Sequence, residues 1–227
     1  FLGINDIFPG FNLKVGQIGL PAALETADIS GNFPFFATSL ASSAFQLPMG
    51  PGAYITYSQD AWSLELAARQ PKFQDVYTVT DPWGASARLS MAPIQNNDIT
   101  IPVSFSFSFQ DITDSSNIIP FSASEFSGRK LKTLDAEELK MINRMTGIVD
   151  FSPRYKSFGL SSEFYLTRVG LRNSDSEGKD SYIVYGGSAS LDWVITGESR
   201  SFSMESGTYG NLSAAENESL GIWDLAV

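Results

Sequence analysis

The feature that most constrains the fold is a strict alternation of apolar and polar residues at positions 99–110, which read ITIPVSFSFSFQ. Successive side chains of a β-strand point to opposite faces, so Phe105 and Phe107 share one face while Ser104 and Ser106 share the other. Such a strand spans roughly 40 Å at about 3.3 Å per residue and exceeds the usual globular strand of roughly 5–6 residues. It suits a tilted strand that crosses a bilayer, which needs about 9–11 residues. A long strand of a soluble β-sandwich fits this segment equally well.

The same period of two recurs along the chain and favours the membrane interpretation. A first strand is expected from Phe11 to near Gly19, and two hairpins pair 53–58 with 62–69 and 85–94 with 99–110. Further alternating segments are 158–167 and 185–196. Charged residues fall on the polar faces of these strands, as a hydrated lumen requires; they are Glu65, Arg69, Arg88, Glu163 and Asp192. The pattern predicts an all-β, antiparallel transmembrane β-barrel in which the whole chain, 1–227, is a single domain.

Composition excludes several classes of protein. The chain has no Cys and no His, so it lacks a disulfide framework, thiolate chemistry, the commonest general base and the commonest metal ligand. No phosphate-binding glycine loop and no Cys/His spacing for a metal is present. We therefore expect no enzymatic activity, no catalytic residues, no metal and no cofactor. The net charge of −10 argues against nucleic acid as a partner, because phosphate binding needs a basic surface.

Two long connections interrupt the strands, at residues 20–52 and 111–147. The first holds an apolar cluster at 33–36 and could fold inward against the wall of a pore. The second contains the one clear helical pattern, at 133–145, where Thr133 is a suitable N-cap and acidic residues fill the first turn. We predict one short helix there, packed on the barrel rim or in a loop, and consider a partner-binding helix as the alternative.

Three segments near the C-terminus occur in the same order as motifs of a known family. They are an aromatic strand that ends in a Thr-Gly-Glu-x-Arg turn, a glycine-rich loop, and a strand resembling Gly-Ala-Trp-Glu-Leu-Ala; they occupy 189–200, 206–210 and 221–227. The last segment carries Ile222 and Asp224 as conservative departures. Near the start, 13–17 and 20–25 resemble the family's Val-Gly-Gln strand and the loop that follows it. In these motifs the chain resembles the phosphate-selective porins O and P. Together the motifs cover about a fifth of the chain.

This resemblance implies a porin of the bacterial outer membrane that sits in lipid, forms a homotrimer and lets small hydrophilic solutes diffuse passively, anions such as phosphate among them. Two features depart from the family. Its members are barrels of about 16 strands, whereas division by strand length gives about 8–10 strands here, so we expect an interior portion of a longer chain or a shortened relative. The family also has basic residues around its inward loop, whereas residues 20–52 contain no Lys or Arg.

Solute selectivity would then depend on basic residues of the barrel wall. The pore-lining candidates are Lys14, Arg69, Arg88 and Arg168, since a base on a hydrated wall attracts anions in a confined space. The structural alternative for each is a wall charge paired with a neighbouring acid such as Glu65 or Asp192. Two other functions stay open: a non-conducting surface barrel whose loops bind a partner, and a soluble all-β binding module.

Overall fold

The computed structural model describes residues 2–19, 21–24, 39–45, 49–70, 83–111, 121–124, 130–134, 141–172, 178–212 and 223–226. Within these residues, eleven strands form one sheet. They are β1 (Leu2–Ile4), β2 (Phe11–Ile18), β3 (Gly50–Ser58), β4 (Trp62–Arg69), β5 (Gly84–Gln95), β6 (Ile99–Asp111), β9 (Met141–Phe151), β10 (Arg154–Tyr155), β11 (Phe158–Leu171), β12 (Ser181–Val194) and β15 (Asp224–Ala226). The smaller elements are α2 (Leu40–Phe45), β7 (Phe121–Ser124), β8 (Lys130–Leu134), β13 (Arg200–Ser203) and β14 (Thr208–Leu212).

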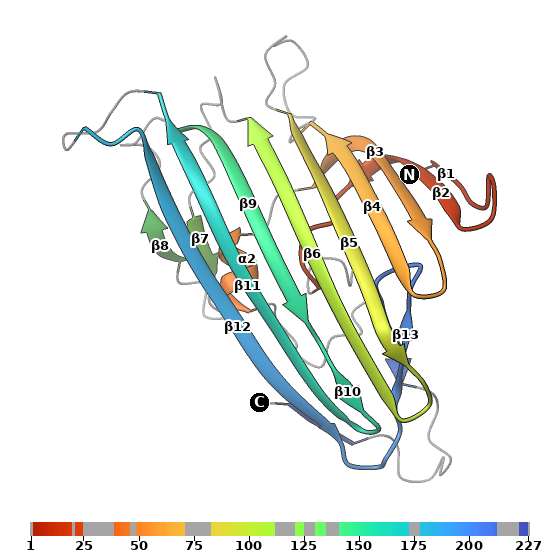
Figure 1. The fold of residues 1–227 in the computed structure, drawn as a ribbon. Coiled ribbons are helices and arrows are strands. Elements are labelled where there is room, and N and C mark those ends of the chain that lie inside the picture. The colour runs from red at the N-terminus through yellow and green to blue at the C-terminus, as the bar shows by residue number, and fades with distance from the viewer. Residues whose placement is uncertain are drawn as a thin grey trace.

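Every pairing in the main sheet is antiparallel, and its order follows the chain. β9 and β10 both lie between β6 and β11, so they act as one strand interrupted at 152–153. Figure 1 shows this curved sheet from one side, with α2, β7, β8 and β13 behind it. Among the described residues β1 and β15 are the two edges and do not pair with each other. The all-β antiparallel architecture is confirmed.

The connections between strands differ at the two ends of the sheet. Tight turns at 59–61, 96–98 and 156–157 join β3 to β4, β5 to β6 and β10 to β11, and together they define the short-turn end. The longer connections that follow β2, β4, β6 and β11 leave from the opposite, long-loop end. Both predicted hairpins are therefore present, with short turns on one side and longer loops on the other.

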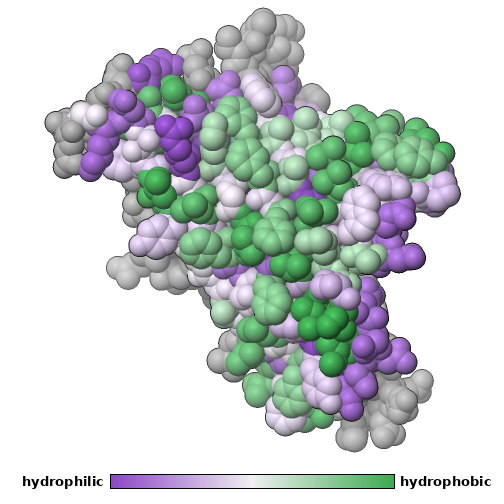
Figure 2. Space-filling model, viewed as in Figure 1, coloured by the Kyte–Doolittle hydropathy of each residue, from purple (hydrophilic) through white to green (hydrophobic). Residues whose placement is uncertain are grey.

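The two faces of the sheet differ in polarity, as the alternation predicts. The outer face exposes large apolar side chains, among them Phe105 at 48% and Phe107 at 53%. Figure 2 shows hydrophobic side chains gathered over this face. The inner face, on the side of α2 and β13, carries buried hydroxyls and charges, including Ser104 and Ser106. An apolar outer face and a polar inner face are the pattern expected of a β-sheet with lipid on one side and water on the other.

The prediction of a helix at 133–145 is wrong at both ends of that segment. Residues 133–134 belong to strand β8, and 141–145 begin strand β9; 135–140 lie outside the described residues. Strand β9 is paired on both sides, with β6 and with β11, and this double ladder of backbone hydrogen bonds overrides local helix propensity. Among the described residues a short helix, α2, lies instead in the first long connection. In the described part of the chain, no helix has the length and apolar character needed to span a membrane.

Candidate functional site

The centre of the inner face holds a buried cluster of three charges. The register sets Glu65 on β4 opposite Arg88 on β5, while Asp150 on β9 reaches Arg88 from across β6. Arg88 Nη1 lies 3.5 Å from Glu65 Oε1, and Arg88 Nη2 lies 3.6 Å from Asp150 Oδ2. The three residues are at most 1% exposed. One cation thus faces two carboxylates, and the cluster links β4, β5 and β9 across the inner face.

Nearer the long-loop end, the inner face carries two arginines on one row of the sheet. The register places Arg69, Gly84, Gln110 and Arg144 side by side on β4, β5, β6 and β9. Arg144 donates through Nη2 to the carbonyl of Phe45 on α2. Arg69 is 3% exposed, and its three guanidinium nitrogens have no hydrogen-bond partner among the residues that the structure describes. The two arginines repel each other, so an anion placed between them would be stabilised by both.

A hairpin made of β13 and β14 enters the inner face from the short-turn end. Its base is held by two hydrogen bonds to the wall. The Tyr209 hydroxyl donates to the carbonyl of Ser152 at 2.7 Å, and Gln95 Nε2 donates to the carbonyl of Phe202 at 3.0 Å. Phe202 and Tyr209 pack with Met204 in a small buried cluster. The hairpin is thus anchored by both polar and apolar contacts.

The turn of this hairpin rests on the central charge cluster. Arg88 Nη2 donates to the carbonyl of Gly207 at 3.2 Å. Gly207 has a φ of 61°, which favours glycine. A Cβ atom at this position would lie 2.8 Å from Ser90 Oγ and 3.3 Å from Glu65 Oε1. Glycine is therefore favoured both by the backbone conformation and by the close approach to the wall.

The first long connection reaches the inner face from the opposite end. On α2, Ser42 Oγ lies 2.8 Å from Glu163 Oε2 and 2.6 Å from the Tyr165 hydroxyl. The Phe45 ring stacks on that of Tyr165 with 5.0 Å between centroids. The described part of this connection folds inward, as the sequence suggested; its apolar cluster at 33–36 lies outside the described residues. Two segments, one from each end, thus cover the polar face.

The comparison with protein families agrees with this arrangement. A sequence model described as phosphate-selective porin O and P matches residues 5–227. The chain belongs to this family. No curated protein matches the chain. Membership of a porin family indicates a channel rather than an enzyme. Among the residues that the structure describes, no group of three or more His, Cys, Asp or Glu side chains could hold a metal ion.

Three of the four predicted pore-lining residues of this porin lie on the inner face of the sheet. Lys14, Arg69 and Arg88 alternate with residues of the outer face, and Lys14 Nζ lies 5.7 Å from the centre of the Tyr54 ring. Arg168 does not join them. It is exposed on the outer face of β11, between Met145 and Ile183 of the neighbouring strands. Successive side chains of a strand point to opposite faces. Thr167 and Val169 point inward, so Arg168 points outward.

Sequence reasoning missed three charged residues of the inner face, namely Arg144, Asp150 and Arg154. The first two lie on β9, whose first residues the sequence predicts as helical rather than as a strand. The Thr-Gly-Glu-x-Arg motif has a further role in the porin. Arg200 Nη2 lies 3.0 Å from Asp224 Oδ2, so this motif is tied to the C-terminal motif that the family shares.

Proposed function

We propose that the chain acts, as a single β-barrel domain in the bacterial outer membrane, as a channel for passive diffusion of small hydrophilic solutes, with anions such as phosphate among them. The family assignment supports a porin. The apolar outer face suits contact with lipid, and the polar inner face suits a hydrated passage. Arg168, on the outer face, then serves to contact lipid head groups at the long-loop rim rather than solute.

The proposed passage of anions rests on one observation: in the described structure, the guanidinium of Arg69 has neither an acidic partner nor a hydrogen-bond partner. Arg88 faces Glu65 and Asp150, so its charge is already compensated. Among the described residues Arg69 has no hydrogen-bond partner, and Arg144, three strands away on the same row, carries the same charge. A charge within about 4 Å of an ion contributes roughly 1 kcal/mol in water and about 4 kcal/mol at an effective dielectric constant near 20. Arg69 thus gives the wall its strongest preference for anions.

Reversal potentials across planar bilayers in a salt gradient test this proposal. The Arg69→Gln variant should lower the anion-to-cation permeability ratio at least fivefold, because about 1 kcal/mol corresponds to roughly that factor. The matched control is Arg168→Gln, which removes the same charge from the outer face and should leave the ratio unchanged. Equal effects of the two substitutions would contradict the assignment of Arg69, and silent bilayers with the wild-type chain would contradict conduction itself.

We also propose a homotrimer, as the resemblance to the family implies. Native mass spectrometry of the protein extracted in a mild detergent measures the assembly directly. A mass of three chains is the expected outcome, and a mass of one chain at all protein concentrations would refute it.

The second candidate function is a non-conducting barrel whose loops bind a partner. It is favoured by one observation: α2 and the hairpin β13–β14 both occupy the inner face and contact the same central region. The bilayer measurement separates the two functions, because a blocked barrel produces no current steps at any voltage.

A further inference from the structure

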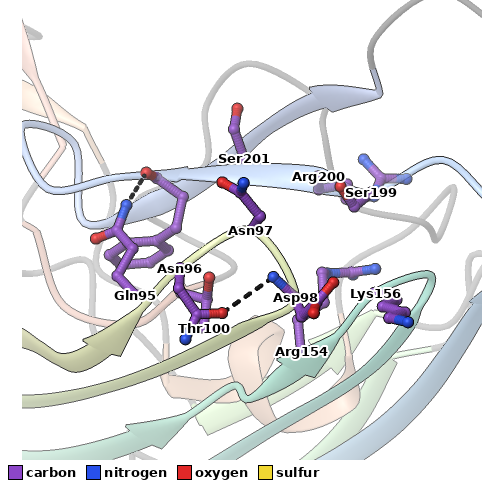
Figure 3. Close-up of a pocket in the computed structure, with 11 residues that line it drawn as sticks. Gln95, Asn96, Asn97, Asp98, Thr100, Arg154, Lys156, Ser199, Arg200 and Ser201 are labelled. Atoms are coloured by element: carbon purple, nitrogen blue, oxygen red, sulfur yellow. Dashed lines mark hydrogen bonds between the residues drawn. The ribbon is translucent and has the colours of Figure 1, made fainter.

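A cavity of about 590 Å³ opens at the short-turn end, away from the arginine row. Its walls come from the β5–β6 turn, from β10 with the turn that follows it, and from residues 199–202 at the start of the hairpin. Figure 3 shows the side chains of the hairpin segment on one side and those of the turn and β10 on the other. The volume lies within the range of about 300–1,000 Å³ of small-molecule sites.

Arg154 supplies buried hydrogen-bond donors to this cavity. It is 7% exposed, and its Nη2 lies 2.9 and 2.7 Å from the two oxygens of Asp192. The pair forms across Gly159, where a Cβ atom would lie only 2.5 Å from Arg154 Nη2. Within the described part of the chain, Nε and Nη1 of Arg154 have no hydrogen-bond partner. A buried guanidinium with open donors is costly unless a ligand or water satisfies it.

The cavity also presents acceptors, and its charges are balanced. Asp98 and Asn97 offer carboxylate and amide oxygens from the turn, and Ser201 offers a hydroxyl from the opposite wall. Arg154 is matched by Asp192, and Arg200 by Asp224 at 3.0 Å. The remaining lining charges, Lys156 and Asp98, are one of each sign. Such a site has no net attraction for a bare anion.

We propose that this cavity binds a neutral saccharide of one or two rings. A sugar hydroxyl both donates and accepts, so a set of hydroxyls can use the open donors of Arg154 and the acceptors of Asp98 together. Inorganic phosphate offers acceptors and negative charge, and Asp98 repels it. This inference rests on the proposed function, because the sugar would reach the cavity through the proposed channel. It adds a class of solute that differs from the anions attracted by Arg69.

Isothermal titration of the full chain with maltose tests the site. The chain is held in a polyoxyethylene detergent, whose head group is neither a sugar nor a phosphate. Maltose should bind, and an equal concentration of inorganic phosphate should not displace it. The Asp98→Asn variant should weaken maltose binding about tenfold, equivalent to about 1.4 kcal/mol. The matched control is Asp60→Asn, an exposed acid in the β3–β4 turn at the same end that does not line the cavity.

Three results would overturn the saccharide site: no heat of binding with maltose, displacement by phosphate, or equal loss of affinity in the Asp98→Asn and Asp60→Asn variants. Because titration in detergent needs no ion flow, a silent bilayer with intact maltose binding refutes only the channel. Conversely, normal conductance without maltose binding refutes only the saccharide site.

Discussion

Replacing Arg88 tests whether the central charge cluster holds the wall together. The Arg88→Met variant keeps most of the side-chain volume but leaves Glu65 and Asp150, each 1% exposed, without their cation. Removal of one partner from a buried ion pair costs about 3–5 kcal/mol. The hydrogen bonds from Nη2 to the Gly207 carbonyl at 3.2 Å and to Ser104 Oγ at 3.3 Å are lost as well, at about 1 kcal/mol each. We expect the free energy of unfolding to fall by about 4 kcal/mol or more.

Urea unfolding in detergent, followed by tryptophan fluorescence, measures this change. A background with Glu65→Gln and Asp150→Asn provides the control, because neutral side chains no longer need the arginine. In that background, Arg88→Met should lower the free energy of unfolding by about 2 kcal/mol or less, because only the two hydrogen bonds of Arg88 are then lost. A loss below about 1 kcal/mol in the wild-type background, or an equal loss in both backgrounds, would show that the arginine is not needed to compensate the buried carboxylates.

Two further predictions concern the hairpin and the outer face. Gly207→Ala should lower single-channel conductance, because a Cβ atom 2.8 Å from Ser90 Oγ pushes the hairpin away from the wall and into the passage. Gly178→Ala has a similar φ of 78° but meets nothing within 4 Å, so it should leave conductance unchanged, and equal currents in both variants would refute the contact. Phe107→Arg should lower the stability of the protein folded in lipid vesicles by about 2–4 kcal/mol, the cost of a base at the lipid-facing midplane of a barrel. Phe107→Leu is its control, and an undiminished stability of the arginine variant would place this face in water.

The strands with clear alternation could be predicted from the sequence. In β6 the outward positions from Ile99 to Phe109 are all apolar, and the inward positions are polar except for Pro102, so a single period identifies both the strand and its faces. The same rule placed Arg69 and Arg88 on the inner face. The rule does not place Arg168 there, because Arg168 lies between the inward-pointing Thr167 and Val169 on β11 and therefore points outward.

Strand β9 and the hairpin β13–β14 could not be recognised from local pattern. On β9 the outward positions include Gly147, and the inward ones include Ile148, so polarity does not alternate cleanly. Its strand conformation is determined by pairing with β6 and β11, which are distant in sequence. The inward fold of the hairpin likewise depends on contacts with Gln95 and Ser152, more than 50 residues away. Such contacts leave no periodic signal in the segment itself.

The two inward segments meet the wall at neighbouring points. Ser42 of α2 binds Glu163, which lies opposite Asp150 in the register, and Asp150 pairs with Arg88, which binds the hairpin at Gly207. The most covered part of the inner face is therefore rich in acids, while the unpaired charge of Arg69 lies toward the long-loop end. In the proposed channel, attraction of anions and restriction of the passage are thus performed by different residues. It follows that substitution of Arg69 should change selectivity more than conductance, whereas substitution of Gly207 should do the reverse.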